Sequence, residues 1–127
     1  MNMIDAVSKV MGNYANFNGR ASRPEFWWWV LALVLLQIVT ATIDRVVIAP
    51  LLGMDPLDPG AGQPLSLLVA LALLLPCLAV CVRRLHDVDR SGWWYFLGLL
   101  PIVGPLVLLF WYVQPGTDGD NRFGAPG

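Results

Sequence analysis

The fold is decided by a charged stretch, Arg83-Arg84-Leu85-His86-Asp87-Val88-Asp89-Arg90-Ser91-Gly92-Trp93-Trp94, in which six of the twelve side chains can ionise. The apolar runs on either side of it, residues 65–82 and 93–113, contain no charged side chain. A run of 18 such residues is long enough for a helix to cross a hydrocarbon core roughly 30 Å thick. The charged stretch is therefore predicted to connect two membrane segments.

The composition of the whole chain supports a membrane protein. Of its 127 residues, 57% are hydrophobic and only 13% are charged, whereas soluble domains average about 25% charged. A net charge of -1 predicts no nucleic-acid partner. A single membrane domain over residues 1–127 fits this length, with an amphipathic cytoplasmic segment at 1–25, a helical bundle at 26–113 and a polar tail at 114–127.

A third uncharged run, residues 26–43, begins with Phe26-Trp27-Trp28-Trp29, and such rings favour the level of the lipid headgroups. We therefore predict an all-α integral membrane protein with three transmembrane helices, over 26–43, 65–82 and 93–113. Pro76 should kink the second of them, because proline removes one helical hydrogen bond. The polar side chains of Gln37 and Thr40 are expected to contact another helix rather than lipid.

The third helix has two alternative courses. Its centre carries Gly98, Pro101, Gly104 and Pro105, and its aromatic groups, residues 93–95 and 110–112, lie about 17 residues apart, or roughly 26 Å along a helix. This spacing favours a single crossing that is kinked at the two prolines. The alternative is a re-entrant hairpin, which would bring both aromatic groups to one side. In either case the two glycines are candidate helix–helix contacts.

The first helix is predicted over residues 3–17, where apolar side chains recur every three or four residues. It is too short and too polar to span. It could lie in the membrane interface or pack on the protein's own loops.

Arginine and lysine placement predicts the orientation. With three crossings, six cations lie on the side of the amino terminus: Lys9, Arg20, Arg23, Arg83, Arg84 and Arg90. The other two, Arg45 and Arg122, lie on the opposite side. The positive-inside rule then makes the amino terminus of this multi-pass protein cytoplasmic. A hairpin would leave seven cations against one, so the cation distribution fits either course.

Three blocks of sequence resemble a known family. They are Phe17-Asn18-Gly19-Arg20-Ala21-Ser22-Arg23-Pro24-Glu25-Phe26-Trp27, the charged stretch already quoted, and Pro115-Gly116-Thr117-Asp118-Gly119-Asp120-Asn121-Arg122-Phe123-Gly124. In the same order, they are similar to those of the bacterial inner-membrane proteins that carry domain of unknown function 805. The resemblance implies a small inner-membrane protein with several helices, and it implies no catalytic residue.

The residues themselves indicate no enzyme, metal or cofactor. His86 is the single histidine, and Cys77 and Cys81, four apart in an apolar run, are expected to be packing residues. On one helix, Arg83 could pair with Asp87 and His86 with Arg90.

Five arginines of the cytoplasmic side are the candidate contacts for an anionic lipid headgroup or an acidic surface of a partner. They are Arg20, Arg23, Arg83, Arg84 and Arg90. The predicted function is that of a non-catalytic membrane protein acting by protein interaction, as an accessory subunit of a larger complex or as a homo-oligomer. The alternative is an anionic-lipid-binding or small-solute transport module. The expected partners are membrane lipids and another membrane protein or a second copy.

Overall fold

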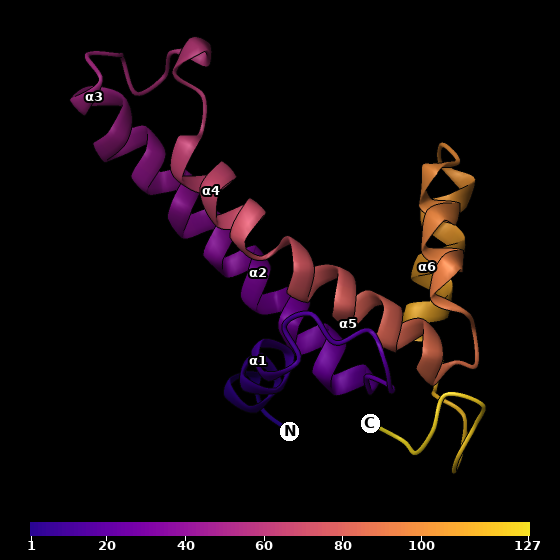
Figure 1. The fold of residues 1–127 in the computed structure, drawn as a ribbon. Helices are drawn as coiled ribbons and strands as arrows, with labels where there is room; N and C mark the ends of the chain where they lie inside the picture. Colours follow the sequence, from indigo (N-terminus) through magenta and orange to yellow (C-terminus); the bar gives the residue numbers. More distant parts are fainter. The chain divides into compact units, whose positions relative to one another are not determined.

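The computed structural model describes all residues from 1 to 127, and its regular elements are all helical (Figure 1). In chain order they are α1 (Met3–Gly12), α2 (Arg23–Ile43), the π-helix η1 (Asp44–Ile48), α3 (Ala49–Leu51), the 3-10 helix η2 (Pro59–Ala61), α4 (Pro64–Ala72), α5 (Leu74–Asp87), the 3-10 helix η3 (Gly92–Leu99) and α6 (Val103–Val113). The predicted all-α class is confirmed. The chain divides into unit 1, residues 1–29 and 75–127, and unit 2, residues 30–74.

Helix α1 begins at an asparagine cap and ends earlier than predicted. The side chain of Asn2 accepts a hydrogen bond from the backbone N–H of Asp5 at 2.8 Å. The predicted end at residue 17 is wrong, because Asn13 terminates the helix at Gly12 by donating from its side chain to the Lys9 carbonyl at 2.8 Å. Asparagine competes for backbone groups in this way and so favours helix ends.

The first predicted span lies inside a continuous helical stretch, Arg23–Leu51, which comprises α2, η1 and α3. This stretch has 29 residues and a mean hydropathy of 2.0, and only 11% of its most apolar window is buried within the protein. Such a helix is long and apolar enough to cross a membrane.

The second predicted span is broken into α4 and α5, which are separated only by Leu73. Pro76 lies in the first turn of α5 and cannot donate a hydrogen bond to the preceding turn, so the predicted kink is confirmed. If this bent pair counts as one span, two segments of the chain are long and apolar enough to cross a membrane.

The third predicted span is a hairpin. Helix η3 ends at Leu99, the chain turns over residues 100–102, where Ile102 has a φ of 68°, and α6 returns beside η3. The rings of Trp94 and Trp111 consequently meet edge to face, 5.7 Å apart. The prediction of one crossing helix kinked at Pro101 and Pro105 is therefore wrong.

Two glycines explain why the arms of this hairpin approach so closely. A Cβ atom on Gly104 would overlap the carbonyl oxygen of Leu97, and one on Gly98 would lie 3.2 Å from the side chain of Leu108. Both glycines were predicted as helix–helix contacts, and both lie between the two arms. With proline at 101 and 105, a continuous helix loses two backbone donors, whereas the hairpin buries Leu108.

Unit 2 has a polar contact at the beginning of α4. The carboxylate of Asp44, which is 1% exposed, accepts hydrogen bonds from the backbone N–H groups of Leu65 and Ser66 at 2.8 and 2.9 Å. It also accepts one from the Ser66 hydroxyl at 2.8 Å. An acidic group suits the unpaired amides of a helix amino terminus. Asp44 thus caps α4 from a distant position in the sequence.

The two polar residues predicted to contact another helix have different surroundings. The hydroxyls of Thr40 and Ser66 are 3.1 Å apart, so Thr40 contacts α4 within unit 2. Gln37 is exposed.

Candidate functional site

The three sequence blocks meet in unit 1 around two buried carboxylates. We call the buried side chains involved the arginine–carboxylate network, which consists of Arg20, Glu25, Arg83, Arg84 and Asp87.

Asp87 joins two of these arginines. The Nε atom of Arg20 donates to one of its oxygens at 2.9 Å, and the Nη1 atom of Arg84 donates to the other. Asp87 lies in the last turn of α5, Arg84 lies one turn earlier, and Arg20 comes from the segment before α2. All three are at most 5% exposed. The carboxylate is therefore bound on both oxygens by charge-assisted hydrogen bonds, which are the stronger class.

The same two arginines hold the carboxyl-terminal tail. Arg20 donates to the backbone carbonyls of Thr117 and Gly119, each at 2.6 Å, and Arg84 donates to that of Gln114. The backbone N–H of Thr117 in turn donates to the Asp87 carbonyl at 2.7 Å. A Cβ atom at residue 116 would overlap the Asp87 carboxylate, so only glycine fits there. The polar tail is thus packed into unit 1.

Glu25 is the second carboxylate and connects three helices. It is fully buried near the start of α2, where it accepts a hydrogen bond from Nη1 of Arg83 at 2.7 Å and lies 3.3 Å from Nζ of Lys9. Lys9 belongs to α1 and Arg83 to α5. The Nε and Nη2 atoms of Arg83 are buried without a protein partner. Glu25 therefore ties α1 and α5 to the first turn of α2.

His86 is held by backbone and ring contacts. Its Nδ1 atom lies 2.8 Å from the Gly19 carbonyl, and because a carbonyl only accepts, this nitrogen carries the proton. Its ring stacks on Phe123 with centroids 4.0 Å apart, and its own carbonyl accepts from the Asn121 side chain at 2.9 Å. His86 is therefore held by contacts to the first and third sequence blocks.

The five predicted contact arginines fall into two groups. Arg20, Arg83 and Arg84 converge on the carboxylates of their own chain. Arg23 and Arg90 are exposed: Arg23 donates to the Val113 carbonyl at 3.2 Å, and the Arg90 guanidinium lies 4.7 Å from the centre of the Trp111 ring. A lipid or partner contact stays a prediction for these two.

Sequence reasoning missed Glu25 as a partner and misassigned Asp87. The i,i+4 spacing predicted an Arg83–Asp87 pair, whereas Arg83 binds Glu25 and Asp87 binds Arg84, three residues before it. The available signal was that Glu25 and Asp87 both lie inside the family-like blocks, beside arginines, at the ends of apolar runs.

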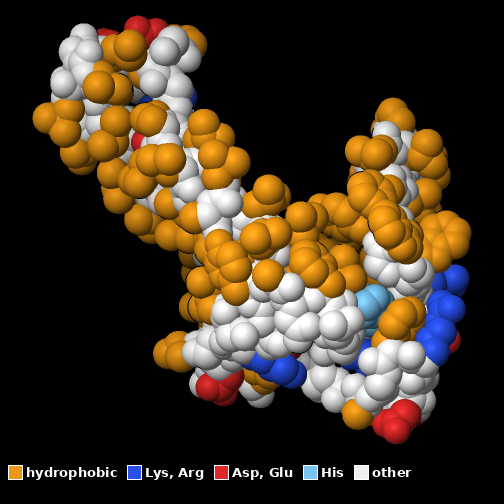
Figure 2. All heavy atoms as spheres, viewed as in Figure 1, with side chains coloured by type: hydrophobic (Ala, Val, Ile, Leu, Met, Phe, Trp, Pro, Cys, Tyr) orange, Lys and Arg blue, Asp and Glu red, His pale blue; other side chains and the backbone are white.

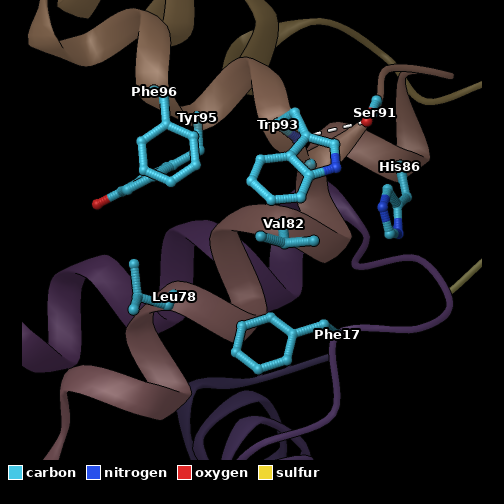
Figure 3. A pocket seen from close by; sticks show the side chains of 9 residues that line it. Phe17, Leu78, Val82, His86, Ser91, Trp93, Tyr95 and Phe96 are labelled. Atoms are coloured by element: carbon cyan, nitrogen blue, oxygen red, sulfur yellow. Dashed lines mark hydrogen bonds between the residues drawn. The ribbon is translucent and has the colours of Figure 1, made fainter.

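Unit 1 also contains a pocket of about 460 Å³ between one face of α5, helix η3 and Phe17 (Figure 3). It is lined by Phe17, Leu78, Val82, His86, Ser91, Gly92, Trp93, Tyr95 and Phe96. Its walls are mainly apolar; polar side-chain atoms come from His86 and Ser91, at the end of α5 and before η3, and from Trp93 and Tyr95 of η3.

Comparisons with known proteins agree with the blocks that build this network. The profile of the family described as "Protein of unknown function (DUF805)" matches residues 14–125. The chain is 38% identical over 121 residues to the inner membrane protein YhaH of Escherichia coli K12, covering 95% of this chain and 94% of YhaH. It is 45% identical over 115 residues to the inner membrane protein YhaI of the same organism, covering 91% and 88%. No solved structure matches the chain significantly. The resemblance is confirmed, and the chain belongs to the DUF805 family.

Proposed function

We propose that this chain is a non-catalytic bacterial inner-membrane protein that acts by binding protein within the membrane, as a homo-oligomer or as an accessory subunit. The observation that carries this proposal is the η3–α6 hairpin, whose arms pack on each other while its outer side chains stay uncovered. Leu99 and Ile102 are 79% and 76% exposed. Figure 2 shows hydrophobic side chains covering this hairpin.

Membrane placement has independent support. Relatives of high coverage are named inner membrane proteins, and the chain has one span candidate in Arg23–Leu51 and a second, bent one in α4 and α5. With a hairpin in place of a third crossing, seven of the eight cations share the side of the amino terminus and only Arg45 lies opposite, which favours a cytoplasmic amino terminus. The tail bonded to Arg20 then lies on the same side. We therefore propose two crossings with both termini in the cytoplasm.

The length of the hairpin explains why it would need a partner. Helix α6 has 11 residues and reaches about 16 Å, roughly half of a 30 Å hydrocarbon core. Its tip at residues 100–102 would lie at mid-membrane, where irregular backbone is normally covered by protein. The two amides that follow the tip are used internally: the N–H of Val103 donates to the Pro101 carbonyl at 2.7 Å, and that of Gly104 donates to the Leu100 carbonyl at 3.2 Å.

Cross-linking in native membranes tests this proposal. In a background with Cys77 and Cys81 changed to alanine, Ile102→Cys places a thiol at the hairpin tip, and Leu71→Cys places a matched control on α4, where the side chain is 59% exposed. A photoactivatable thiol reagent should give a defined product from Ile102→Cys and little from Leu71→Cys. A product of twice the chain mass indicates a homo-oligomer, and a larger product of constant mass indicates an accessory subunit. Equal yields from the two positions, or no product from either, would contradict the proposal.

Lipid binding is the second candidate function, and the pocket favours it over solute transport. A path for a polar solute needs a polar lining, whereas this pocket is lined mainly by aromatic and aliphatic side chains, with His86 and Ser91 at one end.

A further inference from the structure

We infer that the pocket between α5 and η3 is a binding site for one anionic phospholipid, with an acyl chain along α5 and the headgroup at the end formed by His86 and Ser91. Because the site would be filled from the bilayer, this inference rests on the membrane placement proposed above. It does not depend on the identity of any protein partner.

The lining changes from apolar to polar along one helix face. Leu78, Val82 and His86 are four residues apart on α5, so the wall extends about 12 Å from an aliphatic end to an imidazole. Trp93 and Phe96 of η3 form the opposite wall. Figure 3 shows the rings of both residues between η3 and α5. An elongated apolar cavity with a few polar groups at one end fits an amphiphile.

Gly92 sets how closely η3 approaches α5. A Cβ atom on this residue would lie 2.6 Å from a methyl group of Val82. The turn is anchored by Ser91, whose side chain caps η3 by accepting from the backbone N–H of Trp93 at 3.4 Å. Gly92 therefore allows η3 to pack closely on α5 beside Val82, next to the end of the pocket formed by His86 and Ser91.

Arg90 does not line the pocket, but it directly precedes the lining residue Ser91 and is the cation that we assign to an anionic headgroup. Arg90 precedes Ser91, is exposed and forms no ion pair, while Arg122 pairs with Asp89. On the face drawn in Figure 2, cationic side chains gather near the histidine, at the foot of the hairpin. Ser91 can donate its hydroxyl hydrogen to a phosphate oxygen, and Arg90 supplies the unpaired guanidinium. Charge thus distinguishes an anionic from a zwitterionic lipid here.

Native mass spectrometry after delipidation and exchange tests the site, with dioleoyl phosphatidylglycerol and dioleoyl phosphatidylcholine as the two probes. We expect the wild-type chain to retain one phosphatidylglycerol in preference to phosphatidylcholine. Leu78→Trp fills the aliphatic end of the pocket and should weaken lipid retention at least about tenfold. This loss is expected when the acyl chain of the lipid can no longer bury two or more methylene groups. Leu75→Trp is the matched control, because Leu75 lies on the same helix, is 44% exposed and does not line the pocket.

Arg90→Gln distinguishes recognition of the headgroup from burial of the acyl chain. It should abolish the preference for phosphatidylglycerol while leaving retention of both lipids. If Leu78→Trp does not fold, Leu78→Phe, which adds less volume, should give a partial loss. The site would be overturned if the Leu78 variant that folds retained as much lipid as Leu75→Trp. It would also be overturned if the wild-type protein retained neither lipid. These variants leave the hairpin tip intact, so failure here is distinguishable from failure of the Ile102→Cys cross-link.

Discussion

Replacing Asp87 with asparagine tests the arginine–carboxylate network. The amide keeps the size of the carboxylate but removes the one negative charge between Arg20 and Arg84, both at most 4% exposed. Breaking a buried pair typically costs about 3–5 kcal/mol, because the remaining charge stays buried and unpaired. The asparagine oxygen still accepts one hydrogen bond, so we expect a loss near 3 kcal/mol, which is roughly a hundredfold change in the folding equilibrium.

A matched control comes from Asp89, which pairs with Arg122 at 3.1 Å, with side chains 48% and 61% exposed. Asp89→Asn should cost less than about 1 kcal/mol, since exposed ion pairs contribute little, and its φ of 60° tolerates asparagine. The assay is denaturant unfolding in mild detergent, followed by tryptophan fluorescence. In a double-mutant cycle, Arg20→Gln should cost less beside Asp87→Asn than alone. Equal losses of unfolding free energy for Asp87→Asn and Asp89→Asn would contradict a buried, charge-paired Asp87.

The remaining predictions use the same unfolding assay unless another is named. Gly104→Ala should destabilise the protein by roughly 1–3 kcal/mol because its Cβ overlaps a backbone carbonyl, whereas Gly12→Ala, which meets nothing within 4 Å, should be neutral or stabilising by up to about 1 kcal/mol. Ser66→Ala removes a 2.8 Å bond to the buried Asp44 carboxylate and should cost roughly 1.5–3 kcal/mol.

Helical class, the first span and the kink at Pro76 were predictable because each depends on local chemistry. Length and hydropathy identify Arg23–Leu51, and proline acts on its own turn. The course of the third run was not predictable from spacing. An interval of about 17 residues between aromatic groups fits a crossing, and it also fits two arms whose ends meet, as Trp94 and Trp111 do. The backbone contact at Gly104 decides between them, and it is a tertiary feature.

The ion pairs were also not predictable from local spacing. Helical spacing identified Arg83 and Asp87 as neighbours, yet burial of Glu25 beside Arg83 makes the distant pair the observed one. Likewise, the tail was predicted as a polar segment because it is rich in glycine and aspartate. Its backbone carbonyls are nevertheless the acceptors for Arg20, a contact that no side-chain pattern in the tail reveals. The sequence showed only that the three blocks share a family resemblance. It did not show that they meet in space.

The most direct test of this account asks on which side of the membrane the tail lies. In the background without native cysteines, single thiols are introduced by Asp118→Cys in the tail, Asp5→Cys in α1 and Leu57→Cys in the loop before α4, all at exposed positions. A membrane-impermeant maleimide is applied to spheroplasts and to inverted vesicles. We predict that Asp118→Cys and Asp5→Cys react only in inverted vesicles and Leu57→Cys only in spheroplasts. Labelling of Asp118→Cys in spheroplasts would contradict the hairpin and restore a third crossing.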